Sequence, residues 1–104
     1  MKAQSEDRAA LHMRKSSIYC ILDQHVEAKH EADLAVRLNP CAASYYRLGV
    51  TQYLLSEFED SSQSFRAANR MDPASGKIVL AIQKLGVRCR SRKDRDVFID
   101  TTEY

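Results

Sequence analysis

The stretch YYRLGVTQYLLSEFEDSSQSFRAANRMDP, from Tyr45 to Pro73, decides which fold the chain is expected to adopt. It contains two segments with helical spacing and a short polar break between them. The first segment, 42–55, puts one stripe of side chains on a single helix face: Tyr45, Leu48, Gln52 and Leu55. The second runs to about Met71, because the residue before a proline is disfavoured in a helix. The stretch therefore predicts two helices joined by a turn.

The polar break at 56–59 has the pattern of a capping box. In such a box the Ser56 hydroxyl accepts the backbone N–H of Glu59, and the Glu59 side chain reaches back to the N–H of Ser56. We therefore expect Ser56 to be the N-cap of the second helix.

Further helical patterns flank this stretch. One runs from about Ser5 to Leu22 and another from Val26 to Leu38, with a break at 23–24. After Pro73 a fifth helix is expected near residue 75, with an apolar stripe of Ile78, Val79, Ile82 and Leu85. The chain has only 3 Gly and 2 Pro in 104 residues, which favours long helices over a turn-rich β fold.

The two halves of this pattern align when the chain is shifted so that Pro40 falls on Pro73. We call this alignment the repeat register. It superposes further identical residues in both helical segments and at their ends: Ala9 on Ala42, Arg14 on Arg47, Leu22 on Leu55 and Ala35 on Ala68. A repeat of this length built from two helices is typical of helical solenoids, in which each unit packs on the next.

The second copy resembles the tetratricopeptide repeat (TPR) family. The residues that match its pattern are Tyr45, Leu48, Gly49, Ser61, Phe65, Ala68 and Pro73, whereas Gln52 departs from the usual aromatic residue. In the first copy Ser16, Tyr19, Ala28, Ala35 and Pro40 match, and His12 and Lys15 depart. In such a pattern the small residues let helices cross closely and the aromatic residues fill the larger gaps.

The resemblance implies an all-α fold, a TPR-type helical solenoid of two helix-turn-helix repeats plus a C-terminal capping helix. The expected domain spans 1–90, with repeats at about 9–41 and 42–75 and a capping helix at about 76–90. Residues 91–104 are charged and aperiodic, and we expect them to form a flexible tail. The apolar residues 97–99 are the exception, and their docking on the last helix to complete the core is an alternative that stays open.

The resemblance also implies a concave groove lined by the first helix of each unit and by the capping helix. Carried over to this chain, the peptide-binding positions are Met13, Arg14, Ser17, Tyr46, Arg47, Val50, Lys77 and Lys84. Arg14 and Arg47 take the same place in consecutive repeats. Because arginine grips carboxylates with two hydrogen bonds, such a groove suits an acidic peptide or a terminal carboxylate.

Some TPR co-chaperones hold the acidic C-terminal tail of a chaperone in a carboxylate clamp. Arg47 matches a clamp arginine, but Ala43 stands in the place of a lysine and Arg14 in the place of an asparagine. The resemblance thus implies a related groove with an altered preference. The expected function is a protein-binding adaptor or co-chaperone-like scaffold whose partner is a protein or peptide, with a chaperone or an acidic tail as candidates.

Other function classes lack support in the sequence. The three cysteines have wide spacings and no C-x-x-C motif, which argues against a disulfide framework or a zinc site. No motif of catalytic residues or cofactor-binding glycines occurs, so we expect no enzyme, no metal and no cofactor. No apolar run is long enough to span a bilayer, and no secretory signal begins the chain. We therefore expect a cytoplasmic protein, with the nucleus as the alternative location.

Two alternatives remain open. About three or more repeats are usually needed to bury a continuous core, which favours a homodimer or a longer array if Leu11, Ile18 and Ile21 prove exposed. The chain would then be a self-association domain of a larger TPR protein. The basic stretch 84–95 suggests a helical module that binds nucleic acid, although it lacks the aromatic residues that stack on bases.

Overall fold

The computed structural model describes residues 2–87, with side chains from residue 6 to residue 85, and within this range it is all-helical. Its helices are α1 (Lys2–Ile21), α2 (His25–Leu38), α3 (Ala42–Leu54), α4 (Phe58–Met71) and α5 (Gly76–Val87). The predicted all-α class and the order of five helices are confirmed. The first helix begins earlier than predicted, at Lys2. The predicted tail at 91–104 and the end of the predicted capping helix lie outside the described residues.

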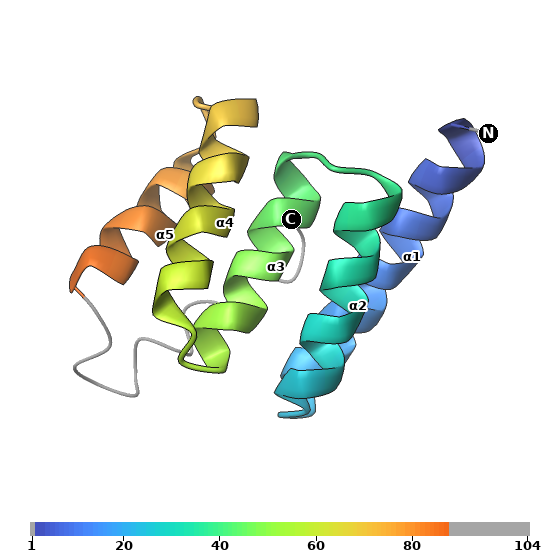
Figure 1. Ribbon diagram of the computed structural model, residues 1–104, viewed down its shortest axis with the longest axis horizontal. Helices are drawn as coiled ribbons and strands as arrows, with labels where there is room; N and C mark the ends of the chain where they lie inside the picture. The colour runs from blue at the N-terminus through green and yellow to red at the C-terminus, as the bar shows by residue number, and fades with distance from the viewer. Residues whose placement is uncertain (1, 88–104) are drawn as a thin grey trace.

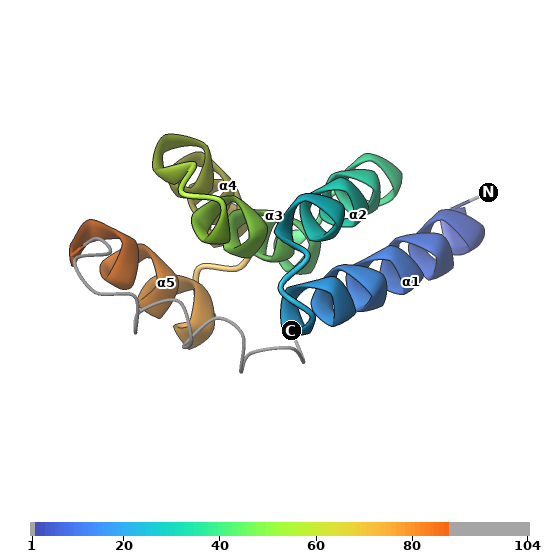
Figure 2. The ribbon, with the colours of Figure 1, turned by 90° about the horizontal axis from the view of Figure 1, so that it is seen from below.

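The helices follow one another side by side from α1 to α5 (Figure 1). α1 pairs with α2 and α3 with α4, while α2 packs on α3 and α4 packs on α5. Figure 2 shows that α2 and α4 lie on one side of the molecule. The helices α1, α3 and α5 follow an arc on the other side, and α3 occupies the middle of that arc. The described chain therefore has two faces built from different helices.

The two turns that close the hairpins have the same backbone geometry. Asp23 has a φ of 60°, and Ser56, its equivalent in the repeat register, has a φ of 63°. Equivalent hydrogen bonds end both preceding helices, from the N–H of Gln24 to the carbonyl of Tyr19 (2.8 Å) and from the N–H of Glu57 to the carbonyl of Gln52 (2.9 Å). A left-handed residue with this bonding is a common helix C-terminus. The turns thus follow the repeat register of the sequence.

The predicted capping box at Ser56 and Glu59 is wrong. Ser56 has a left-handed backbone because it ends α3, whereas an N-cap residue needs a more extended one. The N-cap of α4 is Glu57, and its side chain makes no capping hydrogen bond. A side-chain hydrogen bond to an N-cap residue is present instead at the start of α3, where Ser44 Oγ accepts the N–H of Cys41 at 3.0 Å. The Ser44 hydroxyl therefore stabilises the first turn of α3, and the Ser56 hydroxyl does not cap α4.

A serine hydroxyl joins the two helices of each hairpin where they cross. In the first hairpin Ser16 Oγ on α1 donates to the carbonyl of Ala28 on α2 at 2.8 Å. In the second hairpin Ser61 Oγ on α4 donates to the carbonyl of Gly49 on α3, also at 2.8 Å. Ser16 and Gly49 are equivalent positions in the repeat register, as are Ala28 and Ser61. The same pair of positions is therefore bonded in both hairpins, from opposite helices.

The second hairpin carries the larger side chains of the core. Phe65 is completely buried, and its ring lies 5.6 Å from that of Tyr46. A Cβ atom added at Gly49 would lie 2.7 Å from the Phe65 ring, so only glycine fits there without a shift. By contrast, the buried residues of α2 are Ala28, Ala32 and Ala35. The hydrophobic core therefore lies mainly around α3, α4 and α5.

Candidate functional site

The eight residues predicted to bind a peptide all lie on the helices of the arc. Met13, Arg14 and Ser17 are on α1, Tyr46, Arg47 and Val50 are on α3, and Lys77 and Lys84 are on α5. In Figure 2 these three helices follow one another along the same side of the molecule, away from α2 and α4. We refer to the side formed by α1, α3 and α5 as the arc face.

The solvent exposure of these eight residues differs between the ends and the middle of the arc face. Arg14 is exposed, and Met13, Lys77 and Lys84 are partly exposed. Ser17 and the three residues on α3 are buried: Tyr46, Arg47 and Val50. The side chains that reach solvent in this structure therefore come from α1 and α5, and α3 lies buried between them.

Arg47 lies inside the molecule, with only 1% of its surface exposed. Burial lowers the pKa of its guanidinium, while the neighbouring Cys20 and Tyr46 act in the opposite direction. Burial raises the pKa of the Cys20 thiol, and the charge of Arg47 and a hydrogen bond from it oppose that shift. Because Cys20 is on α1 and Arg47 on α3, this contact connects the two hairpins.

Sequence periodicity gives no signal for the contact between Cys20 and Arg47. The repeat register pairs Arg47 with Arg14, which suggests two arginines in equivalent surroundings. The structure instead exposes Arg14 and buries Arg47. The physical difference is that α3 has neighbours on both sides, with α1 and α2 on one side and α4 on the other.

Basic residues gather on the helices of the arc face. In α1, α3 and α5 the acidic residues are Glu6 and Asp7, and the more numerous basic residues are Lys2, Arg8, Arg14, Lys15, Arg47, Lys77 and Lys84. In α2 and α4 the acidic residues are in excess: Glu27, Glu31, Asp33, Glu59 and Asp60 against Lys29, Arg37, Arg66 and Arg70. The two sides of the described chain therefore differ in the sign of their charge.

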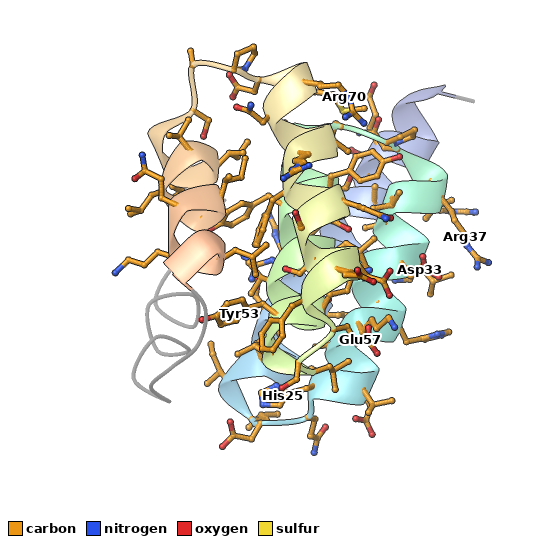
Figure 3. The ribbon with its side chains drawn as sticks, turned by 60° about the vertical axis from the view of Figure 1, so that its left-hand side comes forward. His25, Asp33, Arg37, Tyr53, Glu57 and Arg70 are labelled. Atoms are coloured by element: carbon orange, nitrogen blue, oxygen red, sulfur yellow. The ribbon has the colours of Figure 1, made fainter. Side chains whose placement is uncertain are left out.

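On the side of α2 and α4, two cations are neutralised by neighbouring carboxylates. Lys29 Nζ lies 2.7 Å from Glu57 Oε1, which joins α2 to the residue before α4. Arg37 lies 3.1 Å from Asp33 one turn earlier on α2, and Figure 3 shows both side chains on the outside of that helix. These pairs reduce the positive potential of this side, whose helices also carry an acidic excess.

The described residues also limit which other sites can be considered. Cys20 and Cys41 are free thiols, and Cys89 lies outside the described range. Among the residues described, no group of three or more His, Cys, Asp or Glu side chains is arranged to hold a metal ion. None of the helices described is long and apolar enough to cross a membrane. Most of the basic stretch 84–95 lies beyond residue 87, so the structure does not describe that candidate surface.

Comparisons of the chain with protein families, curated proteins and solved structures find no match. The assignment of a function therefore depends on the geometry and the charges of the chain itself.

Proposed function

We propose that this chain is a non-catalytic protein-interaction module of the TPR type that binds an acidic peptide along the arc face. The observation that carries the proposal is the separation of charge, with basic residues on α1, α3 and α5 and an acidic excess on α2 and α4. A basic surface on packed helices attracts acidic segments and holds its cations at fixed spacings. With this surface the chain acts as an adaptor or scaffold.

The matching hairpin geometry supports a repeat architecture of this kind. Asp23 and Ser56 adopt the same left-handed conformation at equivalent positions of the two copies, and the same crossing positions are hydrogen-bonded in both hairpins. Stacked units of this kind present the first helix of each hairpin on one side. In this chain those helices are α1 and α3, and α5 continues the row.

The accessible cations suggest how the peptide is held. Arg14 on α1 offers a planar guanidinium that binds a carboxylate through two hydrogen bonds. Lys77 and Lys84 on α5 are partly exposed and provide ammonium groups at the other end of the arc face. An extended acidic peptide that lies across α3 reaches both groups. The buried Arg47 contributes its charge from beneath and holds α3 to α1 through Cys20.

Charge reversal on the two sides of the molecule tests the proposal. The arc-face variant carries Arg14→Glu, Lys77→Glu and Lys84→Glu. The control variant carries the same change of charge on α2 and α4, where Arg37, Arg66 and Arg70 are all exposed. Binding of a short fluorescein-labelled polyglutamate peptide is measured by fluorescence anisotropy at low ionic strength, where screening is weakest.

We expect the arc-face variant to lose at least about tenfold in affinity, which corresponds to roughly 1.4 kcal/mol. The control variant is expected to lose less, because its substitutions change only the distant field of the molecule. Equal losses in the two variants mean that the peptide senses net charge alone, and the proposed site is then wrong. Circular dichroism of both variants shows whether the helices remain folded.

A further inference from the structure

A row of exposed side chains runs along α1 to the residue after its end and takes no part in the proposed peptide site. Leu11, Ile18 and Leu22 are 52%, 55% and 58% exposed, and Lys15 between them is also exposed. Their spacings of four, three and four residues place them on one face of the helix. We call these four residues the outer stripe of α1.

The equivalent residues of the second copy are covered. In the repeat register the outer stripe corresponds to Ser44, Leu48, Thr51 and Leu55. The first three are buried and Leu55 is partly buried. The difference between the helices is their neighbours, because α3 has the preceding α1–α2 hairpin packed against it. The chain therefore contains one covered and one uncovered example of the same face.

The helix that packs on α3 shows what kind of surface covers such a face. All the buried residues of α2 are alanines, so the buried part of this helix carries small side chains. The outer stripe is more apolar than its equivalent in the second copy, since Leu11 and Ile18 replace Ser44 and Thr51. Burial of Leu11 and Ile18 by a similar helix therefore removes more apolar surface from water than the α2–α3 contact does at these positions.

We propose that the outer stripe of α1 is a second interaction surface, which docks an amphipathic helix from another helical hairpin. The docked helix is of the α2 kind, with small residues on its contact face. An acidic side chain on that helix pairs with Lys15, which is exposed. This surface lies at the α1 end of the row of helices and goes beyond the peptide site on the arc face.

A second copy of the chain fits the outer stripe less well. An antiparallel pair of α1 helices that brings Leu11 of one copy against Ile18 of the other has its centre between Arg14 and Lys15. These cations of the two copies then face one another, and like charges in such positions are destabilising. A helix with an acidic residue at this place avoids that repulsion.

The chain's own first hairpin serves as the probe. In an extended chain, residues 1–41 are placed directly before residues 9–104. The new junction joins Cys41 to Ala9-Ala10, which reproduces the natural sequence of Cys41 followed by Ala42-Ala43. We expect the added copy of α2 to pack on the internal copy of α1, as the natural α2 packs on α3.

The pair Leu11→Asp and Ile18→Asp is introduced into the native chain and into the internal copy of the extended chain. We expect little change of the urea midpoint in the native chain, where both side chains are exposed. In the extended chain the midpoint is expected to fall by about 1 M or more, because two carboxylates would be buried. The milder pair Leu11→Ala and Ile18→Ala gives the same comparison if the first variant does not fold.

Equal shifts of the midpoint in the two chains would overturn the proposal, because they mean that no helix covers the stripe. Sedimentation equilibrium of the native chain tests the occupant. A monomer across the dilution series supports a foreign helix. A dimer that the Leu11→Asp and Ile18→Asp pair dissociates assigns the surface to a second copy and overturns the proposed partner.

Discussion

The two hairpins fill the same crossing with different side chains. In the second hairpin Gly49 lies under the ring of Phe65, and at the equivalent positions of the first hairpin stand Ser16 and Ala32. Compared with the second hairpin, the first hairpin has a larger residue on its first helix, Ser16, and a smaller one on its second helix, Ala32. The hydroxyl that bonds across the crossing also changes helix, from Ser16 in the first hairpin to Ser61 in the second.

This comparison shows that both hairpins keep one hydrogen bond across the crossing, while the identities and the sizes of the facing residues change. Protein interiors are close-packed, so a residue larger than glycine at the place of Gly49 requires a facing residue smaller than Phe65. This affects how related hairpins are identified from a sequence. Two repeats that agree poorly at single positions can still share a backbone if the pairs of facing residues compensate.

The largest expected effect is the loss of compensation in the second hairpin. Phe65→Ala removes a fully buried ring and is expected to cost about 3–5 kcal/mol of unfolding free energy. Gly49→Ser places a side chain 2.7 Å from that ring and is expected to cost about 1–3 kcal/mol. The double variant recreates the Ser/Ala pair of the first hairpin, so its cost should be smaller than the sum. Urea unfolding of the three variants measures the coupling.

Additive costs in the double variant would contradict the claim that the facing residues of the two hairpins compensate one another. They would mean that the serine finds no room even when the ring is gone, so that the crossings of the two hairpins differ in more than their side chains.

A smaller effect is expected from the hydroxyls that bond across the crossings. Ser16→Ala and Ser61→Ala each remove one buried hydrogen bond from a helix carbonyl that keeps its backbone partner, at a cost of about 0.5–1.5 kcal/mol. Because both bonds are 2.8 Å long and buried, we expect similar losses in the two hairpins. Thermal unfolding followed by circular dichroism compares them. A loss in one hairpin alone would show that the two bonds are not equivalent.

The smallest effect, of opposite sign, is expected at the two turns. Asp23 and Ser56 hold a left-handed backbone that glycine adopts without steric cost. Asp23→Gly and Ser56→Gly are each expected to stabilise the protein by up to about 1 kcal/mol, as measured by the urea midpoint. Asp23→Ala and Ser56→Ala serve as controls, because alanine keeps the steric cost. Destabilisation by both glycines would contradict the assigned backbone geometry.

Sequence periodicity was sufficient to predict the helices and the turns between them, because each helix has an apolar pattern or a proline after it. It failed at Ser56, where the same residue fits either the end of α3 or the start of α4. It also gave no indication that Arg47 is buried against Cys20, since burial depends on the packing of helices that are distant in the sequence. The sequence did not predict that Leu11 and Ile18 are exposed, and their exposure entered only as a condition for a homodimer or a longer array.

The central claim is that the arc face binds acidic peptides. The most direct measurement is a titration of ¹⁵N-labelled protein with the polyglutamate peptide, followed by backbone amide chemical shifts. The account predicts that the largest shifts fall on α1 and α5 around Arg14, Lys77 and Lys84, with smaller shifts on α3. Shifts concentrated on α2 and α4, or no shifts at a peptide excess at low ionic strength, would contradict it.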